Sequence, residues 1–529
     1  MVFGEDNVSN GQTEDSLLSS KASSQYVISK ISKSTKYKEK KKHRRCGRNF
    51  LLVFGILFVI LGILATVFTP YDMLMKLRIR MQPGFPPFEW WLNPPDEVIL
   101  SIYVFNVTNS EEFMNGTDDR MKVQEIGPIS YMEKLIHTFP VFNENGTLTY
   151  TANRTPIYLP ELNPEYLLNK TIVVPNMPVL MIPTYLYDAP FFVKFSVNVM
   201  MRTLNSSPFK TTSIQNFLWN FSDPIVDLAQ NLAPRLVPTK NVGILSRVYA
   251  DFVDNVTVYI GPTYEERKFF LIDKYDGSEF LPNRGGNCKD EVRGATEGVL
   301  YPQKSSKTDV LRYFRKTLCR NVNLVYTNEV EKYGVTGYRY EVPADFFNRT
   351  FPEEDDCYKS TPTLPDGLSD LSPCYYDTAI ATSFPHFLHG SEEIKKYVDG
   401  LEPDPQKHRS YIDLEPETGI PMYGGARAQL NLVVKDMKGF NDKIRKFSNI
   451  AIPLLWLEYV QKGLPWYIEY LIYFQVVLLP IIQVVFSVVM LILGSILMFF
   501  YIRKMSKRKE NLARNKMQRF ETETFLKPQ

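Results

Sequence analysis

The sequence predicts a two-pass α-helical membrane anchor carrying one large, mainly-β ectodomain. Two apolar runs without a charged residue, Phe50–Phe68 and Leu471–Tyr501, lie near the two ends of the 529-residue chain. Basic residues gather on the outer side of each run. Between the runs, short strand-like stretches are often interrupted by Pro and Gly, as in antiparallel strands that are joined by turns.

Both apolar runs are long enough to cross a bilayer, whose hydrocarbon core requires about 20 residues of helix. The first run follows 49 mostly polar residues, and no small-residue cleavage site comes after it. We therefore interpret it as a retained anchor and not as a cleaved signal peptide. Pro480 lies inside the second run, where neighbouring groups or water can satisfy the carbonyl that it frees.

The flanking charges predict that both termini are cytosolic. Residues 1–49 contain 11 Lys and Arg against 5 Asp and Glu, and residues 502–529 contain 9 against 3, so each tail has a net charge of +6. Short Lys/Arg-rich flanks stay on the cytosolic side of a membrane. The expected parts are a disordered basic tail 1–49, a membrane helix 50–69, an ectodomain 70–470, a membrane helix 471–501 and a basic tail 502–529.

The basic stretch Lys36–Arg48 precedes the first membrane helix. In that position it is typical of a topology signal that also contacts anionic lipid, and we expect no nucleic-acid partner. Cys46 lies within the stretch, where it is either a site of reversible palmitoylation or a free cytosolic thiol.

Acceptor motifs and cysteines agree with an ectodomain in an oxidising compartment. Four of the five cysteines, Cys288, Cys319, Cys357 and Cys374, lie in this segment and predict two disulfides with three possible pairings. Zinc binding is the alternative, but the segment contains no Cys-x-x-Cys pair. Nine Asn-x-Ser/Thr motifs are candidate glycosylation sites: Asn106, Asn115, Asn145, Asn153, Asn169, Asn205, Asn220, Asn255 and Asn348.

Periodicity divides the ectodomain into a β scaffold and one helical insert. Val98–Val107 is rich in β-branched and aromatic residues, and Ala426–Val434 alternates apolar with polar residues. Between about residues 191 and 228 the apolar residues recur at helical spacing, which predicts a small helical bundle. Apolar, Met-bearing helices of this kind are more often core than binding surface, although soft side chains can also form a site.

The sequence contains no signature of an active site, so we expect neither an enzyme nor a cofactor. His386 and His389 are spaced as two metal ligands on a helix face would be, but Pro385 opposes a regular helix and a third ligand is not evident. A structural role for both is favoured, and we expect no metal. The carboxylates of Glu353–Asp356 indicate a solvated loop.

Several motifs resemble the class B scavenger receptor family. Ser383–Val434 contains PHFL, DGLEP, HRSYIDLEPETG and QLNLVV in the order of the family's signature stretch. Val123–Tyr131 resembles its GP-x-x-Y element, Leu218–Pro224 its LWGYxDP element, and Ile452–Leu457 its last apolar stretch before the second membrane helix. The resemblance runs from one apolar run to the other and leaves out only the tails.

The resemblance implies a fold and a function that the residues alone do not give. The family's fold is a distorted antiparallel β-barrel with a helical apex and an apolar tunnel towards the membrane. The implied function is a receptor that binds lipids or lipoproteins at the apex and passes fatty acids, sterols or phospholipids through the tunnel. The alternative is an endocytic or lysosomal receptor for protein ligands. Plasma membrane and endosomal or lysosomal membrane both remain open as locations.

The resemblance also implies particular residue roles. By position relative to the family's fatty-acid translocase, it pairs Cys288 with Cys357 and Cys319 with Cys374. The lysine pair that captures anionic ligands in the family falls on Thr203 and Asn205 here. The apex therefore either binds a different ligand, relies on nearby basic residues, or carries only solvated charges. The candidate ligand-binding residues at the apex are Lys194, Arg202, Thr203 and Lys210.

Overall fold

The computed structural model describes residues 49–95, 98–232, 239–250, 254–261, 266–281, 290–375 and 377–525. The chain forms two compact units. The membrane unit comprises the residues up to Met73 and from Leu478 onward, and the ectodomain unit is Leu74–Val477. The N-terminal segment with Cys46 and the segment with Cys288 lie outside the described residues.

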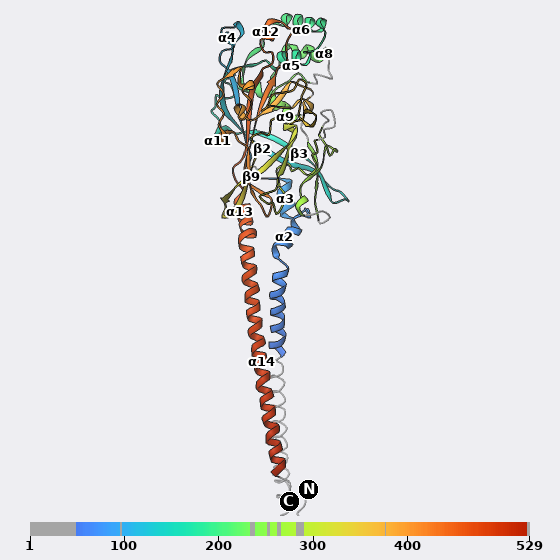
Figure 1. Cartoon of the computed structure of the whole chain (residues 1–529), viewed down its shortest axis with the longest axis vertical. Helices are drawn as coiled ribbons and strands as arrows, with labels where there is room; N and C mark the ends of the chain where they lie inside the picture. Colours follow the sequence, from blue (N-terminus) through green and yellow to red (C-terminus); the bar gives the residue numbers. More distant parts are fainter. Residues whose placement is uncertain are drawn as a thin grey trace, which may run out of the picture. The chain divides into compact units, whose positions relative to one another are not determined.

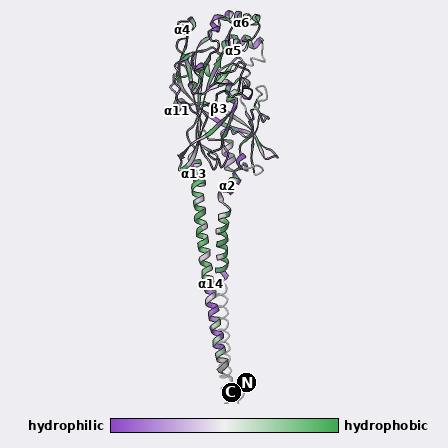
Figure 2. Cartoon of the chain, in the orientation of Figure 1, coloured by the Kyte–Doolittle hydropathy of each residue, from purple (hydrophilic) through white to green (hydrophobic). Residues whose placement is uncertain are grey.

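Two helices have the length and composition of membrane spans. The first is Asn49–Val67, with a mean hydropathy of 3.0. The second, with a mean hydropathy of 2.9, is the helical run Trp466–Phe520. It comprises α13 (Trp466–Tyr473), a π-helical turn and most of α14 (Leu479–Phe525). Figure 2 shows that α14 is apolar over its first part and hydrophilic towards its C-terminal end. Both expected anchors are helices, and the second extends beyond residues 471–501.

Small residues allow the two helices of the membrane unit to approach closely. A Cβ atom added to Gly62 would lie 2.8 Å from the side chain of Leu491, and one added to Gly494 would lie 2.7 Å from that of Val59. Gln483, the second polar residue of the apolar run, donates a hydrogen bond of 2.8 Å to the Ala65 carbonyl. Close approach and a hydrogen bond between helices are the interactions that associate helices in lipid, where the hydrophobic effect contributes little.

The ectodomain is built on one large sheet in which neighbouring strands are antiparallel, except where β13 (Val398–Asp399) pairs in parallel with β2. Its main path runs β7-β6-β3-β2-β1-β16-β15-β14-β10-β9-β8. The expected strand Val98–Val107 is β1. The other strands of the path are β2 (Met121–Phe142), β3 (Thr147–Tyr158), β6 (Asp254–Tyr259), β7 (Ile272–Tyr275), β8 (Leu311–Arg315), β9 (Arg320–Lys332), β10 (Val335–Glu341), β14 (Tyr411–Glu415), β15 (Ile420–Val433) and β16 (Ala451–Gln461).

The strand path is open, with β7 and β8 at its two ends, so strand pairing alone does not make a closed barrel. A short segment nevertheless bonds to both end strands. The amide of Ile272 in β7 donates to the Ala295 carbonyl at 2.8 Å. One residue further, the amide of Thr296 donates to the Arg312 carbonyl in β8, also at 2.8 Å.

One end of the ectodomain is helical (Figure 1). We call it the apex, and it comprises α5 (Met177–Tyr185), α6 (Phe191–Thr203), α7 (Ile214–Trp219) and α8 (Pro224–Leu232). The expected helical insert, residues 191–228, contains α6, α7 and part of α8, but it also contains strand β5 (Phe209–Ser213), which pairs with β4 (Thr171–Pro175). The helix α3 (Pro86–Leu92) and α13 lie at the opposite end in Figure 1.

Replacing Gly62 by Leu tests the helix packing of the membrane unit. The added side chain has no room against Leu491, so we expect the variant to be destabilised by about 1–3 kcal/mol, as for other overpacked sites. Thermal unfolding of the detergent-solubilised chain measures the effect. Thr66→Leu, which adds bulk at an exposed position of the same helix, is the matched control. Equal midpoints for the two variants would contradict the packing.

Candidate functional site

A cavity of about 1510 Å³ lies inside the ectodomain, within the unit Leu74–Val477. Most of the side chains around it are apolar. At the apex, Met181 of α5 and Met200 of α6 line it. The sheet contributes residues such as Leu430 of β15, and Trp90 of α3 and Ile468 of α13 line it at the opposite end. The cavity is therefore in contact with both ends of the ectodomain.

The lining at one end is close in sequence to both membrane helices. Leu74 follows Val67, the last residue of the first membrane helix, by seven positions. Seven residues of chain span at most about 25 Å. At the other side, Ile468 and Leu471 line the cavity and belong to the helical run that continues into α14. Both membrane helices are therefore joined to the cavity lining by short stretches of chain.

The predicted alternation of apolar and polar residues is present in β15, and different parts of the protein lie against its two faces. Ala426, Ala428 and Leu430 on the apolar face line the cavity, whereas Leu432 on the same face belongs to the buried core. Arg427 and Gln429 of the polar face also border the cavity. On the polar face, Gln429 and Asn431 are buried. Gln429 accepts a hydrogen bond from the His386 amide at 2.7 Å and donates to Asn431, so the polar face is covered by protein and not by solvent.

A cluster of charged residues interrupts the apolar lining. Glu133 of β2 is 8% exposed and accepts hydrogen bonds of 2.7 Å from both Arg315 and the Tyr249 hydroxyl. Arg154 of β3 lies 3.7 Å from Glu133 and 3.4 Å from Glu297. Burial by itself raises the pKa of Glu133, but Arg315 and Arg154 outweigh it and hold that pKa below its ordinary value. Both carboxylates and both guanidinium groups line the cavity.

Beside this cluster, His137 and Trp91 form a buried stacked pair with rings 4.6 Å apart. Nδ1 of His137 donates to the Trp91 carbonyl at 2.5 Å, which leaves Nε2 as the unprotonated nitrogen, 3.8 Å from Glu297. Burial lowers the pKa of His137. Within the described residues, neither His137 Nε2 nor the Trp91 indole N–H has a hydrogen-bond partner.

The four basic or hydroxyl residues expected at the apex have different environments. Nζ of Lys194 donates to the carbonyls of Tyr187 at 2.5 Å and of Lys438 at 3.0 Å. Lys210 donates to the Ser222 carbonyl and lies 5.1 Å from the Phe221 ring. Both lysines thus bind main-chain oxygens. Arg202 and Thr203 are exposed at the end of α6, and Thr203 donates back to Val199 of the same helix.

Several apolar side chains of the apex are exposed, which helical spacing did not predict. Phe191 is 67% exposed, Phe192 is 79% exposed and Phe195 is 54% exposed, all on α6. Rings of Phe191 and Phe195 stack with centroids 6.1 Å apart. Val199, one turn further along, is 48% exposed. We call these four residues the apex aromatic patch. The residues whose helical spacing predicted the bundle, such as Ile214, Phe217 and Ile225, are buried in the core as expected, so this exposed apolar surface belongs to α6.

Comparison with known proteins decides the family. The chain matches the CD36 family from residue 53 to residue 505. The chain belongs to the CD36 family. Scavenger receptor class B member 1 of Bos taurus is 27% identical to it over 454 residues, which cover 84% of this chain and 86% of that protein. Lysosome membrane protein 2 of Rattus norvegicus is 28% identical over 394 residues, or 73% of this chain and 79% of that protein. The resemblance inferred from the sequence motifs is confirmed.

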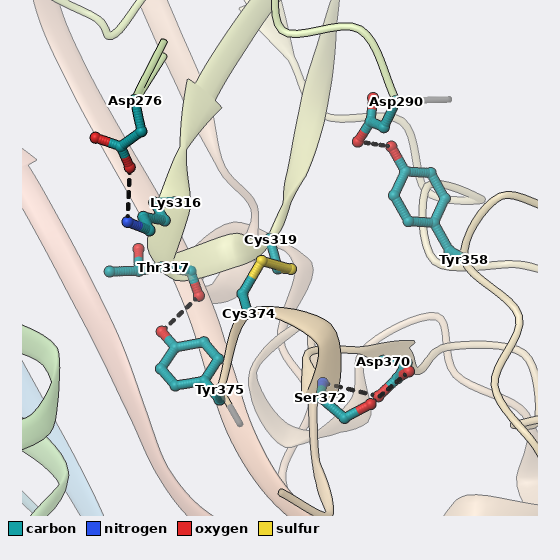
Figure 3. The surroundings of a disulfide bond; sticks show 10 residues. All are labelled: Asp276, Asp290, Lys316, Thr317, Cys319, Tyr358, Asp370, Ser372, Cys374 and Tyr375. Carbon is teal, nitrogen blue, oxygen red and sulfur yellow. Dashed lines mark hydrogen bonds and ion pairs between the residues drawn. A yellow bond between two sulfur atoms is a disulfide. The ribbon is translucent and has the colours of Figure 1, made fainter. Parts of the chain in front are cut away.

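One of the two disulfides that the family resemblance implies is fully described. Cys319 and Cys374 are bonded, with Cα atoms 5.9 Å apart (Figure 3). The Tyr375 hydroxyl donates to the Thr317 carbonyl at 3.0 Å beside the bond, which holds the two segments together on either side of it. Cys357 is also disulfide-bonded. Its expected partner Cys288 lies outside the described residues, so this pairing stays a prediction.

The nine candidate glycosylation sites differ in accessibility. Seven of the asparagines are exposed. The other two, Asn106 and Asn153, are half-buried. The Asn106 side chain accepts a hydrogen bond of 2.8 Å from the Val173 amide, and the Asn153 side chain donates one of 2.9 Å to Thr138. Attachment of glycans stays a prediction for all nine.

His386, within the family's signature stretch, belongs to a buried network. Its Nδ1 accepts from the Glu402 amide at 3.0 Å, so its Nε2 carries the proton and donates to Glu125 at 2.6 Å. Lys407 and the Trp456 indole also bind Glu125. These three partners overcome the effect of burial, which alone raises the pKa of Glu125, and they lower it to about 2.

Histidine His408 stacks on His386 with ring centroids 4.6 Å apart. Its Nδ1 accepts from the Asp404 amide at 3.0 Å, and its Nε2 has no hydrogen-bond partner among the described residues. Burial, His386 and Lys407 lower the pKa of His408 to about 4. His389, the second histidine of the expected pair, is exposed, and the described residues contain no group of three potential metal ligands.

The histidine stack predicts a loss of stability in acid. Because the pKa of His408 falls from 6.5 to about 4 on folding, the unfolded chain takes up this proton first. The contribution is therefore complete above pH 6.5 and is lost as the pH falls towards 4, by about 3 kcal/mol. Chemical unfolding of the full chain at several pH values measures it. His408→Gln should flatten this part of the profile, and an unchanged profile would contradict the assignment.

Proposed function

We propose that the protein is a scavenger-receptor-type membrane receptor that binds lipids or lipoproteins at the apex and passes apolar cargo through the cavity to the membrane. The observation that carries this proposal is the large, mainly apolar cavity whose lining reaches from the apex helices to residues adjacent to both membrane helices. Shielding an acyl chain from water stabilises it by about 0.8 kcal/mol per CH₂. Family membership supports a receptor, and we propose that the protein is not an enzyme.

The capture step is assigned to the apex aromatic patch. Exposed phenylalanines on a soluble surface are unfavourable unless they bind an apolar partner, and contiguous ones mark interaction sites. The helix α6 carries Lys194 and Arg202 and no acidic residue. Because Lys194 is held by main-chain carbonyls, Arg202 is the basic group that would meet anionic lipid heads at the end of the patch.

The transfer step is assigned to a tunnel enclosed by a distorted barrel. The segment around Ala295 and Thr296 bonds to β7 on one side and to β8 on the other. We propose that it completes the wall between the two end strands, so that the sheet encloses the cavity. The proposed path leads from α6 past the sheet to α3 and α13, and from there into the outer leaflet.

The topology and location follow from the same proposal. Both termini lie in the cytosol, and the glycosylated ectodomain faces the extracellular space or the lumen of endosomes and lysosomes. The cargo classes are fatty acids, sterols and phospholipids, delivered free or in lipoproteins. The plasma membrane is the proposed site, with the endolysosomal membrane as the alternative.

A receptor for protein ligands is the second candidate function. It is favoured by the similarity to lysosome membrane protein 2. It is also compatible with the apex aromatic patch, because aromatic residues are enriched where proteins bind proteins. In this case the apex alone would carry function, and the cavity would be dispensable.

Blocking the cavity distinguishes the two functions. Ala428→Trp places a bulky side chain in the lining, and we expect it to reduce transfer of labelled fatty acid or sterol into vesicles that contain the full chain by about tenfold, while particle binding at the apex is retained. Thr336→Trp, at an exposed position of β10 outside the cavity, is the matched control. Equal transfer by both variants would reject the cavity as the path.

Replacing two rings of the apex patch tests capture. Phe192→Ser with Phe195→Ser should weaken binding of lipid particles by more than tenfold, since burying one such ring contributes about 1.5–3 kcal/mol. Flotation of particles with the full chain in nanodiscs measures binding. Phe139→Ser removes a ring that is 80% exposed on β2, away from the apex. If that variant binds as weakly as the double variant, capture is not specific to the apex.

A further inference from the structure

Arg315 lies in the cavity wall with most of its hydrogen-bond donors unused. A guanidinium group carries five N–H donors. Among the described residues, Glu133 is the one acceptor that Arg315 reaches, through a single bond of 2.7 Å. The side chain of Arg315 is 15% exposed, and Arg315 is part of the cavity lining. Its remaining N–H groups therefore have the cavity as their available space.

The position of this guanidinium is fixed by its neighbours. It lies over the Tyr459 ring of β16, 4.1 Å from the centroid. Glu133, its partner, is itself held by the Tyr249 hydroxyl at 2.7 Å and lies 3.7 Å from Arg154. A cation that is already oriented loses little conformational entropy when it binds a ligand.

The charged residues of the lining favour a negative ligand. All basic residues of the described lining are arginines, and there are five of them against three carboxylates, a difference of +2. This difference falls to +1 when Glu458, which pairs with Arg427 at 2.7 Å, is also counted. In apolar surroundings such an excess acts more strongly than in water. Guanidinium also matches carboxylate and phosphate oxygens geometrically and binds them through paired hydrogen bonds. The arginines are Arg78, Arg154, Arg247, Arg315 and Arg427, and the carboxylates are Glu133, Glu297 and Asp377.

We propose that Arg315 forms an internal head-group site: it binds the anionic head of a single-chain lipid, a carboxylate or a phosphate monoester, while the chain lies against the apolar lining. This site is separate from the capture surface at the apex, and it rests on the proposed function in that the cavity must admit lipid. It assigns the charged cluster a role in selecting cargo by its head group.

The test compares three photoreactive probes with the same 16-carbon chain: a hexadecanoate, a hexadecyl phosphate and a hexadecanol. Labelling of cavity peptides in the full chain, reconstituted in nanodiscs, gives the half-saturating concentration of each. We expect the wild type to bind at least one anionic probe about tenfold or more tightly than the neutral probe, as a charge-assisted hydrogen bond implies. The anionic probe that binds more tightly shows whether the site prefers a carboxylate or a phosphate head group.

Arg315→Gln should abolish this preference and leave hexadecanol binding unchanged. The double variant Glu133→Gln with Arg315→Gln removes both charges of the pair, keeps the net charge and should show the same loss with an unchanged unfolding midpoint. Arg267→Gln, which removes an arginine paired with Asp309 outside the cavity lining, is the control. Its probe preference should equal that of the wild type.

The outcomes separate this inference from the proposed function. If Arg315→Gln retains the wild-type preference, or if the three probes bind the wild type equally, the head-group site is wrong while the lipid cavity stands. If Arg315→Gln weakens all three probes alike, the effect is on the cavity as a whole and the head-group site is also wrong. If no probe labels the wild-type cavity, both proposals fail.

Discussion

The hollow centre of the ectodomain is the constraint on which the rest of the structure depends. A sheet of this size normally packs one apolar face against a second layer, and empty apolar space in a core is destabilising. Here the apolar face of β15 borders a cavity of about 1510 Å³. The sheet is therefore held by the core that packs beside the cavity, which includes Leu100 and Ile102 of β1 and Ile452 of β16, and by polar contacts.

The outer face is held by polar interactions that are buried and specific. His386, Lys407 and Trp456 all bind Glu125, and Gln429 binds the His386 amide. These contacts connect β2, β15 and β16 with the segment that follows β12 (Ile380–Ser383). Directional hydrogen bonds of this kind fix the register of a sheet more narrowly than apolar contacts do. The outer network therefore holds the sheet in one arrangement while its inner face stays open.

The periodicity of apolar residues predicted secondary structure in parts of the chain, but it did not predict what surrounds those elements. The strand Val98–Val107 and the helical spacing of residues 191–228 predicted real elements, because side-chain period follows backbone geometry. Periodicity separates two faces but does not say what lies against each. Thus alternation did not indicate that Ala428 of β15 lines a cavity, and helical spacing did not indicate that Phe192 of α6 is exposed.

Contacts between distant residues were beyond sequence reasoning altogether. Arg315 and Glu133 are 182 positions apart, and nothing in either local pattern indicates a buried ion pair. Lys194 lay in the expected region, but its binding to the Lys438 carbonyl, 244 positions away, could not be seen. By contrast, the family motifs located the signature stretch, and the uncharged apolar runs located both membrane helices, because these features depend on contiguous residues.

The charged cluster in the cavity is more economically explained by function than by stability. Removing two charges from water costs several kcal/mol per ion, and apolar residues of similar volume often replace such pairs without loss of stability. The cluster also lies where it interrupts an otherwise apolar lining, so it would hinder the passage of a wholly apolar molecule. A lipid with an acidic head reverses that disadvantage, because its head group satisfies the unused donors of Arg315 while its chain covers the lining. A cavity built in this way accepts amphiphiles in preference to hydrocarbons, and helix α6, which carries the apex aromatic patch and Arg202, presents the same two properties to the outside.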